Sequence, residues 1–381
     1  MSEKESKACL APEEADTKQA INQAAEIIIN GGIAAFPTET VYGLGADATN
    51  PVAVARIYQA KGRPGDNPLI MHISDPLAFW QLTHNAPDYV RPLISAFWPG
   101  PLTMVAKKKP GLAAWLGGHP KGITETIGIR MPSHPMALAV IEASGCYVAA
   151  PSANKAGTPS PTQAGHVAAD FNDGSIDYIL DGGPVPGGLE STVVDVTGPL
   201  PVILRPGAVT AEMIAEVTGL QVISVVSEHS ADGPEALKGN SGEPPRAPGM
   251  KYRHYAPKAP MTVLVGDEAA VAAYILEETA KEQGRKVGIL VSSQTQNAIR
   301  NVSIIDENIV CLILGDKAAP ETIARNLYAC LRQFDIIGVD EIYAEGLAQE
   351  GLGIAIMDRM KKAAEGRVVH VPVKSSIHMH G

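Results

Sequence analysis

The chain has 381 residues, of which 45% are hydrophobic and 19% are charged. This length allows two domains, each with a sizeable apolar core. The formal net charge is −10, and up to residue 225 there are 14 basic residues against 21 acidic ones. An acidic body argues against tight non-specific binding to nucleic acid or to anionic lipid.

The four cysteines, Cys9, Cys146, Cys311 and Cys330, lie far apart and form no CxxC pair. Their spacing predicts neither a structural zinc site nor a disulfide scaffold, and it fits a reducing compartment. The N-terminal residues are charged, unlike a signal peptide, and no stretch approaches the roughly 18 apolar residues of a membrane helix. The sequence therefore predicts a soluble, cytoplasmic protein with no membrane partner.

The first half of the chain alternates between helical and extended patterns. Apolar residues recur at helical spacing over 16–30, and residues 33–36 form a short apolar run that Pro37 ends. Further helices are predicted at 52–60 and 89–97, and strands at 69–73, 102–106, 127–130, 147–149, 178–180, 192–196 and 202–204. This alternation predicts an α/β fold around a mostly mixed sheet.

A change in composition divides the chain. Residues 226–259 are rich in proline and have almost no apolar periodicity, which is typical of a linker. Beyond it, the segments MTVLVG, KVGILVS, NVSIIDE and EIYAEGL predict strands, with helices at 269–283 and 321–334. We therefore predict a first domain at 1–225, a linker or lid at 226–259, a smaller Rossmann-like α/β domain at 260–373 and a tail at 374–381.

Common nucleotide-binding and catalytic motifs are missing: there is no GxxxxGK[ST] loop, no complete GxGxxG, no HExxH and no GxSxG. The segment PTETVYGLG instead places the hydroxyls of Thr38, Thr40 and Tyr42 directly after a predicted strand. Gly43 and Gly45 would let the backbone approach a ligand closely. The alternative is a Pro/Gly turn whose threonines only cap their own backbone.

Cationic residues follow in the segment KGRPGDNPL, where Lys61 and Arg63 are predicted to project from a surface loop toward polyphosphate or carboxylate. An ordinary solvated loop is the alternative. Arg130 and Arg205 each end an apolar strand before a proline, so each is either a structural ion-pair partner or a ligand contact. If these four cations cluster, they form an anion site inside an acidic domain.

Two polar features remain. His72 lies in the apolar run LIMHI, where, by itself, a histidine buried in the core is a more common explanation than a ligand contact. The segment PSANKAGTPS follows a predicted strand, and its short side chains Ser152, Asn154, Thr158 and Ser160 could hold phosphate oxygens or a purine edge. It could also be an ordinary exit from a strand.

Taken together and in this order, PTETVYGLG, KGRPGDNPL with His72, a strand ending in IR, APSAN, GGLESTVVD and RPG resemble the threonylcarbamoyl-AMP synthase family. PGMKYRHYAP followed by a compact α/β domain resembles the two-domain form of that family, which has a YrdC-like N-terminal domain. The resemblance implies a twisted α/β sheet with a concave ligand face. It also implies ATP-dependent condensation of L-threonine with bicarbonate or CO2, with release of pyrophosphate.

The resemblance assigns roles to individual residues. The KxR signature would be Lys61 and Arg63, which are the expected catalytic residues, and the SxN signature would be Ser152 and Asn154. The threonine side would be lined by Thr40, His72, Arg130, Ala150 and Ser191. The ATP side would be lined by Arg63, Asn67, Thr126, Ser152, Asn154, Ser160, Arg205 and Tyr255. Mg²⁺ would be held through the ATP phosphates and not by a dedicated protein site.

The product implied by the resemblance would serve a downstream tRNA threonylcarbamoyl transferase complex, which modifies adenosine 37 of ANN-decoding tRNAs. No stable direct binding of nucleic acid is expected. Because the product is a labile mixed anhydride, the Pro-rich segment with Tyr252, Arg253, His254 and Tyr255 is a candidate lid; a simple spacer is the alternative. Two other functions compete with this one: an RNA-binding module without catalysis, and carbamoyl transfer in hydrogenase maturation, whose paired-cysteine zinc motifs this chain lacks.

Overall fold

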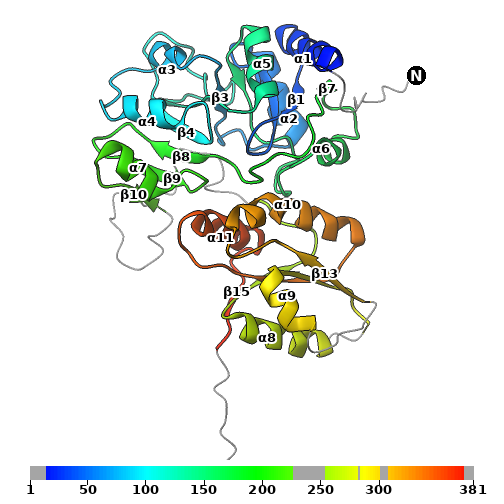
Figure 1. The fold of residues 1–381 in the computed structure, drawn as a ribbon. Coiled ribbons are helices and arrows are strands. Elements are labelled where there is room, and N and C mark those ends of the chain that lie inside the picture. Colours follow the sequence, from blue (N-terminus) through cyan, green and yellow to red (C-terminus); the bar gives the residue numbers. More distant parts are fainter. Residues whose placement is uncertain (1–13, 226–253, 282–283, 301–307, 373–381) are drawn as a thin grey trace, which may run out of the picture. The chain divides into compact units, whose positions relative to one another are not determined.

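The computed structural model describes residues 14–225, 254–281, 284–300 and 308–372 (Figure 1). The chain divides into two compact units, Met1–Tyr252 and Arg253–Gly381. The predicted tail and most of the predicted linker lie outside the described residues, so the boundaries at 225 and 260 stay predictions. Within the described residues, no helix has the length and apolar character that a membrane crossing requires.

The first unit is an α/β domain built on a ten-stranded sheet with the strand order β10-β9-β8-β4-β5-β3-β6-β2-β1-β7. Parallel pairs such as β3 with β5 and β4 with β8 alternate with antiparallel ones, so the predicted mixed sheet is confirmed. Its elements in chain order are α1 (Glu14–Ile29), β1 (Ala34–Pro37), β2 (Tyr42–Asp47), α2 (Pro51–Lys61), β3 (Ile70–His72), α3 (Leu77–Leu82), α4 (Val90–Phe97), β4 (Leu102–Lys107), β5 (Thr126–Arg130), α5 (Pro135–Ser144), β6 (Val148–Ala149), α6 (Ala164–Asp170), β7 (Tyr178–Ile179), β8 (Thr192–Asp195), β9 (Val202–Arg205), α7 (Ala211–Thr218) and β10 (Ile223–Ser224).

Local sequence explains how α2 begins and ends. Asn50 caps its first turn, because its side chain accepts hydrogen bonds from the backbone N–H groups of Val52 and Ala53. Gly62 ends it in the left-handed conformation at φ 61°, which costs glycine little. Lys61 therefore belongs to the last turn of a helix that is fixed at both ends.

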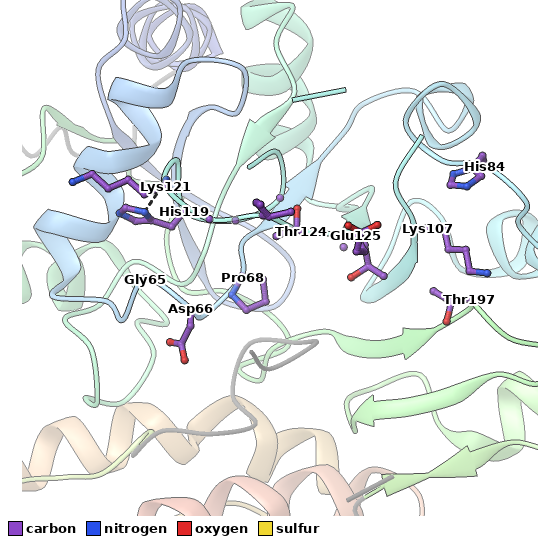
Figure 2. A pocket seen from close by; sticks show the side chains of 16 residues that line it. Gly65, Asp66, Pro68, His84, Lys107, His119, Lys121, Thr124, Glu125 and Thr197 are labelled. Atoms are coloured by element: carbon purple, nitrogen blue, oxygen red, sulfur yellow. Dashed lines mark hydrogen bonds between the residues drawn. The ribbon is translucent and has the colours of Figure 1, made fainter. Parts of the chain in front are cut away.

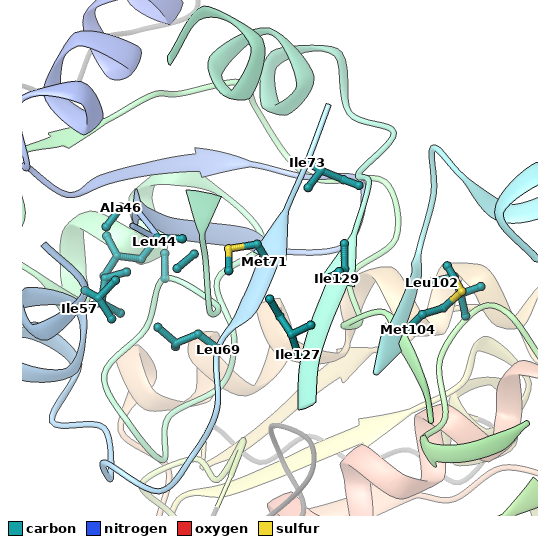
Figure 3. Packing of buried hydrophobic residues seen from close by; sticks show 14 of the residues in the cluster. Leu44, Ala46, Ile57, Leu69, Met71, Ile73, Leu102, Met104, Ile127 and Ile129 are labelled. Atoms are coloured by element: carbon teal, nitrogen blue, oxygen red, sulfur yellow. The ribbon is translucent and has the colours of Figure 1, made fainter. Parts of the chain in front are cut away.

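The central strands β3, β5 and β4 have two different faces, because successive side chains of a strand point to opposite sides. Met71, Ile127, Ile129, Leu102 and Met104 join the main apolar cluster on one face (Figure 3). The other face carries the alternate residues of the same strands, among them Thr103, Gly128, His72 and Arg130. One side of each strand is thus committed to the core, and the other is available for polar chemistry.

Among its described residues, the second unit has five strands, all parallel, in the order β13-β12-β14-β11-β15. The predicted smaller Rossmann-like domain is therefore confirmed. Its elements are β11 (Met261–Val265), α8 (Glu268–Lys281), β12 (Val287–Val291), α9 (Ser293–Arg300), β13 (Ile309–Ile313), α10 (Pro320–Ile337), β14 (Glu341–Glu345), α11 (Leu352–Ala363) and β15 (Val368–His370).

Two predictions about local structure need comment. The segment PTETVYGLG, expected to be a loop or turn after the first strand, is a turn only up to Val41, because Tyr42–Asp47 is strand β2, paired antiparallel with β1. The segment NVSIIDE lies outside the described residues, and the strand found in this region is β13 at Ile309–Ile313. Turn-forming glycines concealed β2, since alternating Gly43 and Gly45 lower the apparent strand propensity.

Candidate functional site

A row of polar side chains crosses the sheet of the first unit from β9 to β3. Arg205 donates hydrogen bonds from Nε to the Ser191 carbonyl at 3.1 Å and from Nη2 to Ser191 Oγ at 3.2 Å. Ser191 Oγ lies 2.8 Å from Thr103 Oγ1 on β4. Met104 pairs with Ile129, which brings Thr103 to the level of Arg130. Arg130 in turn pairs with His72 across β5 and β3. Four of the predicted site residues therefore meet in one row.

Arg130 also holds the turn between β1 and β2. Its Nη2 donates to Glu39 Oε1 at 2.6 Å, and the backbone N–H of Ser133 donates to Glu39 Oε2 at 3.1 Å. Both side chains of the ion pair are largely buried, at 5% exposure for Arg130 and 13% for Glu39. The buried Nε of Arg130 has no hydrogen-bond partner within the described part of the chain. A buried guanidinium N–H without an acceptor is suited to a ligand oxygen, such as that of a carboxylate.

His72 lies beside Arg130 as a buried, neutral imidazole. Burial and the neighbouring Arg130 charge lower the pKa of His72 to about 3. Its Nδ1 lies 3.2 Å from the carbonyl oxygen of Ile70. The row thus contains a cation and an uncharged hydrogen-bonding ring side by side, which is a favourable surface for one carboxylate.

Lys61 is not on a surface loop, and that prediction was wrong. It is the last residue of α2 and only 2% exposed. Its Nζ donates to the carbonyl oxygens of Ser152 and Asn154, both at 2.5 Å. The Gly62 cap ends the helix there, and the Lys61 ammonium is buried, where it holds the segment that follows β6.

Arg63 plays a similar part in the segment 63–68. It donates from Nε to the Asn67 carbonyl at 3.2 Å, and from Nη2 to Asn67 Oδ1 at 2.8 Å and to the Pro68 carbonyl at 2.6 Å. Tyr58 OH also donates to the Asn67 carbonyl, at 3.0 Å. Asn67 is buried at 1% exposure, so this loop is folded back on itself and well fixed.

The SxN segment is internally bonded. Ser152 Oγ donates to Asn154 Oδ1 at 2.6 Å, and Asn154 Nδ2 donates to the carbonyls of Lys155 and Thr158, both at 2.9 Å. Ser160 Oγ donates to Glu190 Oε1 at 2.5 Å, directly beside Ser191. These bonds connect the end of β6 to the start of β8.

Other residues that the sequence singled out are also buried. Thr40 is buried, and its Oγ1 lies 2.8 Å from Thr38 Oγ1. Thr38 also caps its own turn by bonding to Val41, as the alternative interpretation of this segment expected. Ala150 is buried and donates its backbone N–H to the Ile70 carbonyl at 3.0 Å. Tyr42 is structural, since its OH donates to the Gly183 carbonyl at 2.8 Å.

A cavity of about 1000 Å³ opens beside this arrangement (Figure 2). Pro68, Thr126 and Gly128 line it, and Gly128 lies on the same face of β5 as Arg130 because residues two apart share a face. Lysines add positive charge, and Asp66 and Glu125 add negative charge. The cationic or titratable bases lining it are His84, Lys107, His119 and Lys121.

The row of polar side chains and the cavity lie at opposite ends of β3. His72 pairs with Arg130 at one end, whereas Ile70 pairs with Gly128 at the other, next to the cavity. A strand of three residues spans about 7 Å between its first and last residues. The row and the cavity are therefore neighbours on one face of the sheet, within the reach of a small amino acid joined to a nucleotide.

Tyr255 belongs to the second unit, where it is 5% exposed. Its ring stacks on Tyr328 at 5.3 Å between centroids, and the Arg359 guanidinium lies 5.6 Å from its centroid. Tyr252 and Arg253 of the predicted lid lie outside the described residues. The proposed lid and the part of Tyr255 in nucleotide binding therefore stay predictions.

Glu39, Thr103 and Glu190 are parts of this arrangement that the sequence did not single out. Each contacts a partner that is distant in the chain. Glu39 and Arg130, for example, are 91 positions apart. The only local signal for Glu39 is its position between two threonines in PTETVYGLG. Within the described residues, no three His, Cys, Asp or Glu side chains are grouped so that they could hold a metal ion.

The fold and the row together define a class: two-unit α/β proteins whose larger sheet carries a row of cationic and polar side chains beside a large cavity. The Sua5/YciO/YrdC family model, described as telomere recombination, matches residues 26–207. The model of the threonylcarbamoyl-AMP synthase C-terminal domain matches residues 209–365. Between them, these models account for both units.

Curated and solved relatives cover nearly the whole chain. The threonylcarbamoyl-AMP synthase of Bacillus subtilis strain 168 is 45% identical over 350 residues, which are 92% of this chain and 94% of that protein. The synthase of Pyrococcus abyssi is also 45% identical and covers 92% of this chain and 96% of its own length. The crystal structure of P. abyssi Sua5 complexed with L-threonine matches with a TM-score of 0.80 at 42% identity, covering 93% of this chain and 97% of that one.

The chain belongs to the threonylcarbamoyl-AMP synthase family, a family of enzymes. The resemblance stated from its motifs is confirmed, including the two-domain form. Relatives of matching length that carry the synthase name favour this function over an RNA-binding module without catalysis.

Proposed function

We propose that this protein condenses L-threonine with bicarbonate or CO2 and ATP to give threonylcarbamoyl-AMP and pyrophosphate. The observation that carries the proposal is the buried Arg130, with a free Nε, beside neutral His72 on a sheet face that adjoins a 1000 Å³ cavity. The P. abyssi relative crystallised with L-threonine supports threonine as the amino acid. The product would supply a tRNA threonylcarbamoyl transferase complex in the cytoplasm.

The chemistry needs alignment and charge stabilisation more than it needs a protein nucleophile. The deprotonated amine of threonine attacks CO2 to form an N-carboxylate. This carboxylate attacks the α-phosphorus of ATP, and pyrophosphate leaves. Each step moves negative charge, so fixed cations and N–H donors lower the barrier.

In this proposal, Arg130 and His72 hold the threonine carboxylate, with Thr40, Ala150 and Ser191 shaping the rest of the amino-acid site. Arg130 can receive the carboxylate on its unpartnered Nε without first releasing Glu39. A pocket that forms a hydrogen bond with the threonine hydroxyl would discriminate strongly against an analogue without that hydroxyl. It would discriminate less strongly against serine, which keeps the hydroxyl and lacks only a methyl group.

The nucleotide would occupy the cavity, with its phosphates toward the row. Arg63 and Asn67 lie next to Gly65, Asp66 and Pro68 of the cavity wall, and Thr126 lines the cavity itself. Ser160 is bonded to Glu190, and Arg205 to the adjacent Ser191. Lys61, Ser152 and Asn154 form the bonded segment between them. Mg²⁺ bound to the ATP phosphates would neutralise part of their charge, which fits a donor set without an acidic cluster among the described residues.

The test is incubation of the purified protein with ATP, L-threonine, Mg²⁺ and ¹³C-bicarbonate, followed by mass spectrometry. We expect an adenylate that carries one ¹³C, and pyrophosphate release that depends on both threonine and bicarbonate. Tight binding of tRNA without any pyrophosphate release would instead favour the RNA-binding alternative.

A further inference from the structure

Lys108, which follows β4, has its ammonium group surrounded by oxygen atoms of a single loop. Its Nζ donates to the carbonyls of Ala113 at 3.0 Å and Ala114 at 2.6 Å, with the Leu116 carbonyl at 3.4 Å. Thr124 Oγ1, on the returning arm of the loop, lies 3.0 Å away. The lysine thus connects both arms of the β4–β5 connection.

This loop forms a large part of the cavity wall. Eight of the sixteen lining residues come from 117–125, including three glycines and His119 (Figure 2). The loop contains no helix or strand between Lys107 and Thr126, so its shape depends on individual contacts. Gly111 and Gly117 adopt φ of 89° and 93°, which glycine tolerates because it has no Cβ, and the same lack of a Cβ gives the unfolded loop more conformational freedom.

Other contacts hold different parts of the loop. His119 packs edge-on against Tyr58 at 4.8 Å between ring centroids, and Leu69 donates its N–H to the Gly117 carbonyl at 3.0 Å. Thr124 Oγ1 itself donates toward the Leu116 carbonyl at 2.8 Å. Lys108 adds an ammonium group at the base of the loop, and hydrogen bonds from an ammonium are stronger than those between neutral groups.

The base of the loop joins directly to the predicted nucleotide residue Thr126. The Lys108 backbone N–H donates to the Glu125 carbonyl at 2.9 Å, and Lys107 pairs with Thr126 between β4 and β5. Burial lowers the pKa of the Lys108 ammonium, and the Glu125 carboxylate opposes this shift. The Lys108 ammonium is partly withdrawn from water and binds three backbone carbonyls. We infer that it stabilises the conformation of the loop and is not an ordinary solubilising surface charge.

We propose that Lys108 is a positioning residue for the nucleotide: it holds the 113–124 segment as a preformed wall of the cavity against the start of β5. The inference rests on the proposed function, since it takes the cavity as the ATP site. Without the ammonium, the wall loses its charged tie between the two arms and keeps only neutral ones, such as the Thr124 hydrogen bonds to the Ala114 and Leu116 carbonyls. ATP must then order the loop further as it binds. Ordering on binding lowers the affinity for that ligand without changing the chemical step.

The test compares Lys108→Met, which keeps chain length without charge, with Lys108→Arg and with Lys109→Met as the matched control. Lys109 is the adjacent exposed lysine. The first readout is hydrogen–deuterium exchange of the 113–124 amides, which needs no activity. We expect Lys108→Met to accelerate this exchange and to raise the KM for ATP about tenfold, the effect of losing one charged hydrogen bond. The KM for threonine and kcat should stay within about twofold, the size of indirect effects.

Lys108→Arg should restore most of the protection and of the ATP affinity, and Lys109→Met should resemble the wild type. Unchanged exchange in Lys108→Met would overturn the proposal, as would faster exchange with an unchanged KM for ATP. If Lys108→Met does not fold, Lys108→Gln gives the same comparison with an uncharged donor. If the wild type makes no adenylate, the proposed function fails, but titration with a non-hydrolysable ATP analogue still measures the effect of Lys108.

Discussion

Arg130 and Glu39 form a largely buried ion pair, with Nη2 and Oε1 at 2.6 Å, that joins the end of β5 to the turn between β1 and β2. The pair leaves the Nε of Arg130 as the group available to a ligand. It therefore fixes the guanidinium in one orientation before substrate arrives, which reduces the entropy lost on binding.

Replacing Arg130 should separate its structural role from its binding role. Arg130→Met leaves the Glu39 carboxylate without its ionic partner, so we expect the free energy of unfolding to fall by about 2 kcal/mol. Adding Glu39→Gln should recover part of this loss, because the neutral amide that replaces the carboxylate keeps an oxygen able to accept from the Ser133 N–H. Threonine binding should be lost in both variants.

Urea unfolding and calorimetric titration with threonine measure the two effects. A double variant as unstable as Arg130→Met would mean that the pair does not couple the two residues energetically. Retained threonine affinity in Arg130→Met would remove this arginine from the proposed amino-acid site.

His72 should make stability fall at mildly acidic pH. Its pKa is about 3 in the folded protein because of burial and the Arg130 charge, against about 6.5 in an unfolded chain. Between these values the unfolded state binds the extra proton, so stability rises with pH and is lost on acidification. From pH 7 to pH 5 this amounts to about 2 kcal/mol.

His72→Gln removes the titrating group. The unfolding free energy of the wild type minus that of the variant should therefore fall by about 2 kcal/mol from pH 7 to pH 5. Urea unfolding at several pH values measures it. Parallel stability curves for the two proteins would show that His72 is not held neutral.

Lys61 should contribute to stability as well as to synthesis, contrary to what a loop position would imply. Lys61→Met leaves the carbonyls of Ser152 and Asn154 without their donor. We expect a loss of about 2 kcal/mol in unfolding free energy, together with loss of adenylate formation. Lys18→Met, at an exposed position of α1, is the control for removing a lysine. If Lys61→Met unfolds at the same urea concentration as this control, the ammonium has no structural role.

The two glycines of β2 should respond differently to alanine. A Cβ at Gly45 would lie 2.5 Å from Phe36 Cε1 and 2.8 Å from Val148 Cγ1, whereas one at Gly43 would find ordinary contacts from 3.5 Å. Gly45→Ala should therefore cost about 1–3 kcal/mol through overpacking. Gly43→Ala should cost distinctly less.

Thermal unfolding of the two variants side by side tests this prediction. Equal losses would contradict it. The comparison also bears on the expectation that both glycines serve a ligand, since the close contacts at Gly45 are with the apolar core.

Much of the fold could be predicted from the sequence, because helix caps, apolar periodicity and strand runs are local. The mixed sheet and the parallel second unit followed from that alternation. Strand β2 could not be recognised, because Gly43 and Gly45 are typical turn residues and their packing partners Phe36 and Ala150 become neighbours only in the sheet.

The sequence allowed us to predict which residues belong to the candidate site. It did not allow us to predict which of them contact one another. Arg130 and Arg205 stood out because each ends a strand, and the structure brings both into one row. Their partners Glu39 and Thr103 are determined by strand order, which no local pattern encodes. The burial of Lys61 was missed for the same reason, since the carbonyls that it holds lie about ninety residues further along the chain.

The central claim is that the end of the row formed by Arg130 and His72 is where threonine is held for reaction with ATP. A crystal structure of the protein soaked with L-threonine tests it most directly. We predict electron density for the amino acid with its carboxylate within hydrogen-bond distance of Arg130 Nε and next to His72. Threonine bound elsewhere in the first unit, with the Arg130 Nε still lacking an acceptor, would contradict it.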